Sequence, residues 1–119
     1  MSEITASKRQ LTIKTGVVKR LTKEEKTYVK EVEEQLARID QYISEGKDEW
    51  HVNKQREVLQ DCIKMVPDCR KRLQNAVEDL ESLLEGLEGE IHSTDEAKAA
   101  SEVLQLAKAS LEEHGKASF

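Results

Sequence analysis

The chain has 119 residues, a length that suits one domain, and 36% of them are charged while only 3% are aromatic. Its formal net charge of −5 argues against a protein that binds nucleic acid through phosphate contacts. The sequence has a single Pro, few aromatic residues and no long alternation of period two, so it predicts long amphipathic helices and no sheet.

A first helix is expected over about residues 7–45. Ser7 has capping-box spacing with the glutamine three residues later, whereas an alternative start at Thr15 would leave residues 1–14 as an extended arm. We prefer the longer helix because Leu11 stays in phase with the apolar stripe that follows. Three heptad positions of this stripe are polar and weaken it: Lys14, Glu25 and Gln35.

Most of the positive charge lies on this first helix. Eight basic and two acidic residues occur between Lys8 and Lys30, whereas eight acidic and no basic residues occur between Glu78 and Glu96. Such runs usually mark solvated helix faces, or two helices that attract each other within a bundle. The functional alternative is a polarised surface that steers a charged protein partner. The candidate contact residues on this face are Lys14, Lys19, Arg20, Lys23 and Lys26.

A short turn separates the first helix from the second. Gly46 can supply a left-handed C-cap, and Asp48 can cap the next helix. Trp50 then lies in the first turn of the second helix, where it could cover the end of the bundle. A loop this short requires the second helix to fold back antiparallel.

The second helix is expected over about residues 49–85, along a seam with heptad spacing. Its members are Val52, Gln55, Leu59, Cys62, Val66, Cys69, Leu73, Ala76, Leu80, Leu83 and Leu87. We expect this seam to be internal and to bury Cys62, Val66, Leu73 and Leu80. The two cysteines lie roughly 10 Å apart along the helix, too far for a disulfide, and we interpret them as small buried residues in a reducing compartment.

Pro67 interrupts the second helix. It removes one backbone hydrogen bond, and because the seam stays in phase on both sides we expect a kink at this point. The alternative is two separate helices that meet at Pro67. A polar cluster follows the proline, and either it solvates the outer face of the kink or it contacts a partner. The cluster consists of Asp68, Arg70, Lys71 and Arg72.

A third helix is expected over about residues 94–114, after a turn bracketed by Gly86 and Gly89. Ser93 is the predicted N-cap, with Glu96 at the third helical position. Its inner face carries Leu104 and Leu111 together with three small residues that allow close packing: Ala97, Ala100 and Ala107. The predicted fold is all-α, a single elongated antiparallel three-helix bundle over residues 1–119, in which the short third helix covers only part of the groove between the first two.

The sequence lacks recognisable catalytic or cofactor chemistry. The segment Gly16–Lys19 lacks the second glycine and the Lys-Ser/Thr ending of a phosphate loop, and the three histidines occur singly. We therefore expect no enzyme activity, no cofactor and no metal. No signal peptide, membrane span or lipidation motif is visible, which predicts a cytosolic protein. The acidic balance also opposes a bundle that binds lipid surfaces.

Several short sequence motifs nevertheless indicate a family. They are Ile13–Leu21, Tyr28, Lys54-Gln55 with Val58-Leu59, and Met65–Leu73. Over roughly residues 11–111 the chain resembles tubulin-binding cofactor A. The resemblance implies a three-helix rod that captures β-tubulin monomers after their release from the cytosolic chaperonin and before assembly with α-tubulin. It also implies that no ATP or GTP is used, that other tubulin-folding cofactors are met only indirectly, and that the protein serves the cytoplasmic microtubule cytoskeleton.

The partner surface implied by this resemblance is spread along the helices. Our hypothesis is that the basic face of the first helix meets acidic tubulin surface, and that Asp68, Arg70 and Arg72 supply a second contact. Gly46, Trp50 and Pro67 are assigned structural roles. The alternative function is a coiled-coil scaffold or oligomerisation module without a tubulin client, and the sequence leaves monomer and homodimer both open.

Overall fold

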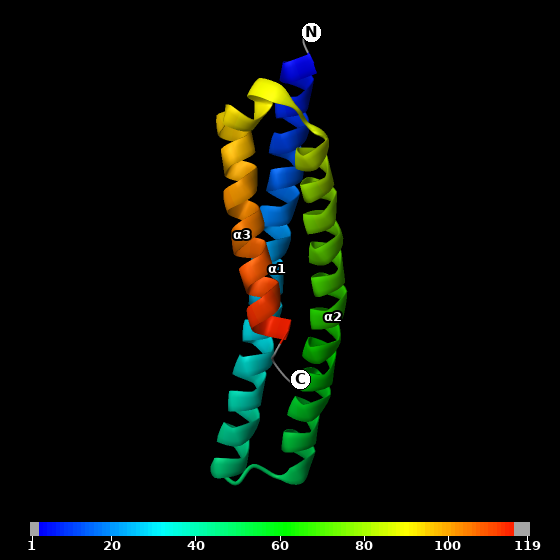
Figure 1. Cartoon of the computed structure of the whole chain (residues 1–119). Helices are drawn as coiled ribbons and strands as arrows, with labels where there is room; N and C mark the ends of the chain where they lie inside the picture. Colours follow the sequence, from blue (N-terminus) through cyan, green and yellow to red (C-terminus); the bar gives the residue numbers. More distant parts are fainter. Residues whose placement is uncertain (1–2, 116–119) are drawn as a thin grey trace.

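The computed structural model describes residues 3–115, which form three α-helices and one short 3-10 helix. The elements are α1 (Glu3–Ser44), α2 (Glu49–Gly86), η1 (Gly89–Ser93) and α3 (Asp95–Gly115). α1 and α2 run antiparallel along a rod with extents of 66 × 22 × 17 Å, and α3 lies against the half of the rod that is remote from the α1–α2 turn (Figure 1). The predicted fold class, an elongated antiparallel three-helix bundle, is confirmed.

α1 begins at Glu3, four residues before the predicted start at Ser7, and the alternative start at Thr15 is wrong. Leu11 is fully buried in the core, so the apolar stripe already packs against the other helices before Thr15 and stabilises the helix there. The helix ends in a Schellman motif, because Gly46 N–H donates to the carbonyl of Ile43 at 3.1 Å and Lys47 N–H donates to that of Tyr42 at 3.0 Å. Gly46 has a φ of +72°, a conformation that glycine adopts without a Cβ penalty.

α2 begins with Asp48 as its N-cap, and the carboxylate of this residue accepts the His51 N–H at 3.0 Å. This backbone hydrogen bond lowers the pKa of the Asp48 carboxyl below its usual value, and the hydrogen bond from the His51 side chain makes the second largest contribution. The sequence suggested that Trp50 covers the end of the bundle. This is wrong, since the side chain is 63% exposed. Two residues correspond to about 200° of helix rotation, so Trp50 faces solvent when Val52 faces the core.

α2 continues as one helix through Pro67, so the alternative of two helices is wrong. Pro67 is exposed on the outer side of the rod, and the kink expected there stays a prediction. Val66, Leu73 and Leu80 are buried as expected, but Cys62 is only half-buried because it lies where α1 and α2 pack without α3. Both cysteines are free, and burial raises the pKa of the Cys69 thiol.

The core changes character along the rod. Where α3 is present, residues of all three helices form one large cluster, and Ala97, Ala100 and Ala107 let α3 approach closely. Beyond the end of α3, a smaller cluster joins α1 and α2 around Val32 and Val66. No helix within residues 3–115 has an apolar stretch long enough to cross a membrane.

The cap of α3 differs from the prediction by one residue. Thr94 is the N-cap, because its Oγ1 accepts the Ala97 N–H at 3.2 Å. Ser93 belongs to η1 instead, and its hydroxyl donates to the carbonyl of Glu90 at 2.8 Å. The 3-10 turn thus moves the start of α3 one residue beyond the position that the capping-box pattern indicated.

Candidate partner-binding surface

Two of the five predicted basic contacts on α1 are engaged within the molecule. The ammonium group of Lys14, which is half-buried, forms a salt bridge with Asp79 on α2. Arg20 lies 4.0 Å from Glu24, one turn further along α1. Asp79 belongs to the acidic run between Glu78 and Glu96, so part of the charge polarity read from the sequence holds helices of the bundle together.

The polar cluster after Pro67 is also largely engaged. Arg72 and Asp68 form an exposed salt bridge of 2.9 Å along α2. Arg70 instead reaches across to α3, where Nη1 donates to the carbonyl of His114 and Nη2 to that of Leu111, both at 3.3 Å. The carbonyls at the end of a helix lack intrahelical donors, so this guanidinium caps the last turn of α3. The sequence placed Arg70 on a partner surface, but its hydrogen bonds are internal.

The remaining three predicted contacts, Lys19, Lys23 and Lys26, lie together. Within residues 3–115 no carboxylate is within salt-bridge distance of their ammonium groups. They line an open hollow of about 190 Å³ between α1 and α3, here called the lysine hollow. Its other lining residues are Thr22, Val103 and Leu106.

The lysine hollow combines charge with an apolar floor. Thr22 is buried there, and its hydroxyl donates to the carbonyl of Val18 at 2.7 Å, so that hydroxyl already has an acceptor within α1. On the α3 side, Val103 is half-buried and Leu106 is 64% exposed. An exposed leucine beside unpaired lysines is the combination of apolar anchor and polar rim that protein interfaces use.

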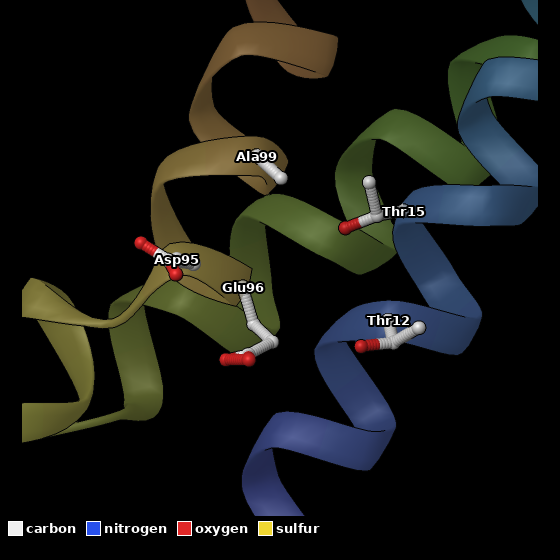
Figure 2. Close-up of a pocket in the computed structure, with 5 residues that line it drawn as sticks. All are labelled: Thr12, Thr15, Asp95, Glu96 and Ala99. Atoms are coloured by element: carbon white, nitrogen blue, oxygen red, sulfur yellow. The ribbon is translucent and has the colours of Figure 1, made fainter.

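A second hollow lies between the N-terminal turns of α3 and α1, where Thr12 and Thr15 lie across from Asp95, Glu96 and Ala99 (Figure 2). Its charged groups are carboxylates and it lacks a cationic side chain among its lining residues. No group of three or more His, Cys, Asp or Glu in residues 3–115 is placed to hold a metal ion. This hollow therefore offers neither a cationic group for an acidic partner nor a ligand set for a metal ion.

Sequence reasoning missed a buried polar cluster formed by Glu25, Arg70, Ser110 and His114, here called the Glu25 cluster. Glu25 is fully buried, and its Oε1 is hydrogen-bonded to Nδ1 of His114 and accepts the Ser110 hydroxyl at 3.0 Å. Arg70 Nε lies 3.9 Å from its other oxygen. The signal was present, since Glu25 occupies a heptad position that should be apolar.

Together, these features define a class of protein: a small all-α rod with a polarised surface and a cationic, partly apolar hollow. The sequence model of the family "Tubulin binding cofactor A" matches residues 6–104. Tubulin-specific chaperone A of Gallus gallus is 44% identical over 100 residues, which cover 84% of this chain and 92% of the relative. The chain belongs to the tubulin binding cofactor A family, as its short sequence motifs indicated.

Solved structures agree with this assignment. Tubulin folding cofactor A from Arabidopsis thaliana superposes with a TM-score of 0.79 at 34% identity, over 88% of this chain and 98% of that one. RBL2P, described as a beta-tubulin binding post-chaperonin cofactor, gives a TM-score of 0.76 at 32% identity, over 87% and 98% of the two chains. These relatives are named as chaperones or cofactors, which agrees with the prediction of a protein without enzyme activity.

Proposed function

We propose that this chain is a tubulin-folding chaperone that captures and stabilises β-tubulin monomers released from the cytosolic chaperonin, before they assemble with α-tubulin. The observation that carries the proposal is the family match over residues 6–104, in a fold shared with a protein described as binding β-tubulin. The proposed setting is the cytoplasm and its microtubule cytoskeleton, and other tubulin-folding cofactors would be met only through the client.

The lysine hollow is the proposed contact surface. Of the eight residues expected from sequence to contact a partner, Lys19, Lys23 and Lys26 are the ones whose charge is not already paired within the described chain. A free ammonium group can attract a carboxylate of the client without first breaking an internal ion pair. The exposed Asp68–Arg72 pair remains a second proposed contact, since Arg70 is engaged with α3.

This arrangement suits a holding chaperone with no chemical step. Exposed charge pairs contribute little each, on the order of 0.2–1 kcal/mol, so a client held by several of them dissociates readily. Such pairs also weaken as salt screens them. The rod would therefore cover the aggregation-prone surface of a monomer and release it to its next partner without nucleotide hydrolysis.

Co-purification tests the proposal directly. The immobilised full chain is mixed at physiological salt with β-tubulin or with α-tubulin, and retained protein is quantified. We expect β-tubulin to be retained in clear preference to α-tubulin. Analytical ultracentrifugation of the same mixtures separates the alternative, because a coiled-coil scaffold would self-associate and form no complex with either tubulin. Retention of neither tubulin would refute the proposed function.

A further inference from the structure

We propose that the lysine hollow receives an acidic amphipathic α-helix of the client, with one apolar side chain seated between Val103, Leu106 and Thr22. This inference rests on the proposed function and specifies the chemistry of the segment that is recognised. It follows from three observations about the hollow: its unpaired charge, its apolar side and the spacing of its lysines.

The charge of the hollow is one-sided. Its three lysines all come from α1, and the two apolar residues, Val103 and Leu106, come from α3. A partner that satisfies both sides must therefore present carboxylates along one edge and an apolar residue along the other. A uniformly acidic segment would leave Leu106 exposed, and a purely apolar one would bury unpaired ammonium groups at high cost.

The spacing of the lysines favours a helix over an extended strand. Lys19, Lys23 and Lys26 follow the i, i+4, i+7 pattern of one helix face and extend over roughly 10 Å along α1. A partner helix that lies along the hollow repeats the same pattern, so three of its carboxylates can face three lysines. Side chains on one face of a strand recur about every 7 Å, so three of them span about 14 Å and overshoot the roughly 10 Å from Lys19 to Lys26.

The exposure of Leu106 indicates where the partner contributes apolar contact. Leu106 is 64% exposed although it lies beside half-buried Val103 and buried Thr22. Leu106 belongs to α3, and within residues 3–115 no neighbouring segment covers the exposed part of its side chain. A helix seated on the lysine hollow would bury this side chain at the centre of the contact, where interface residues contribute most.

The test uses a fluorescent synthetic helix of about 18 residues, with Glu at positions i, i+4 and i+7 and two Leu beside them, and measures its binding to the full chain by anisotropy. The double variant Lys19→Glu/Lys23→Glu should weaken binding about tenfold or more, because two attractions become repulsions. The matched control is Arg56→Glu/Lys64→Glu, which makes the same change of net charge on exposed positions of α2. The control should change the affinity less than twofold.

A second pair of variants tests the apolar side. Leu106→Ala should weaken binding about fivefold, whereas Leu36→Ala, at another exposed leucine of the rod, should leave it unchanged. Alanine favours helix at both positions, and circular dichroism confirms that each variant folds. A polyglutamate peptide of equal length that binds as tightly as the amphipathic probe would overturn the inference, as would equal effects of the lysine-hollow and control variants.

β-tubulin itself separates this inference from the function on which it rests. If the wild-type chain retains β-tubulin and Lys19→Glu/Lys23→Glu retains it equally well, the lysine hollow is not the client site and the chaperone function stands. If the wild-type chain retains no β-tubulin, the proposed function fails, whatever the probe does. Loss of both the probe and β-tubulin in the lysine variant, with both kept in the control, supports the two proposals together.

Discussion

The Glu25 cluster fastens the last turn of α3 to the other two helices, and His114→Ala is the sharpest perturbation of it. The imidazole of His114 is the closest partner of the fully buried Glu25 carboxylate. Its removal leaves the buried carboxyl group of Glu25 with the Ser110 hydroxyl at 3.0 Å and the Arg70 Nε only at 3.9 Å. Loss of the closest hydrogen-bond partner of a buried carboxyl group therefore dominates the expected effect.

The magnitude follows from the burial of the two groups. Removing one partner of a buried acid–base pair costs about 3–5 kcal/mol, and the 15% exposure of His114 together with the retained Ser110 hydrogen bond reduces this to about 2–4 kcal/mol. For a chain of this size, 3 kcal/mol lowers Tm by about 10 °C. Urea unfolding followed by circular dichroism at 222 nm measures the change. The same substitution at His51, which is half exposed beside a solvated Asp48, is the control and should cost less than 1 kcal/mol.

A combined variant identifies the cause of the loss. Glu25→Leu/His114→Leu replaces the polar pair with apolar side chains and should restore part of the stability lost in His114→Ala, because the Ser110 hydroxyl then loses its acceptor and Arg70 its carboxylate. Amide hydrogen exchange should show early opening of α3 in His114→Ala but not in the combined variant. A free energy of unfolding within 1 kcal/mol of wild type in His114→Ala would refute the reasoning, because Glu25 would then not depend on its imidazole partner.

Three further predictions address other features of the rod. Pro67→Ala restores a backbone donor to α2 and should raise the free energy of unfolding by about 1 kcal/mol or more in urea titrations; loss of β-tubulin retention by this folded variant would show that the client requires the backbone geometry that Pro67 imposes. Gly46→Ala places a Cβ at φ +72° and should cost about 1 kcal/mol in the same assay, and an unchanged stability would contradict the strain argument. Cys69 should react with a thiol reagent at pH 8 more slowly than Cys62, because burial disfavours its thiolate, and equal rates by mass spectrometry would contradict this.

The sequence predicts those parts of the fold that depend on local pattern. The heptad seam of α2 indicates its length and its buried residues, and Gly46 and Asp48 mark the turn because glycine and aspartate have specific roles at helix ends. The predictions fail where a single residue of phase matters. Trp50 lies two positions from Val52 and so points outward, and the 3-10 turn of η1 makes Thr94 the cap of α3 in place of Ser93.

The candidate site was only partly predictable, because a run of basic residues does not reveal which of them are paired. Lys14 meets Asp79 and Arg70 meets His114 across 65 and 44 residues of sequence, and these contacts depend on how the helices rotate against one another. The lysine hollow also needs Val103 and Leu106 from α3, which no local pattern relates to Lys19 or Lys26. The sequence therefore identified the basic face, and the pairing of Lys14 with α2 and of Arg20 within α1 separates its internal charges from its free ones.

The polar residues that weaken the heptad pattern of α1 specify how the helices align. An apolar seam that repeats every seven residues stays in phase when one helix slips by a heptad, so it does not by itself define a unique alignment. Lys14 pairs with Asp79, Glu25 with His114, and the Gln35 amide donates to the Gln55 carbonyl at 2.9 Å. A slip of one heptad would move each group about 10 Å from its partner and leave two of them buried without one. The positions that look like defects in the sequence thus exclude the shifted bundles that the apolar seam alone would permit.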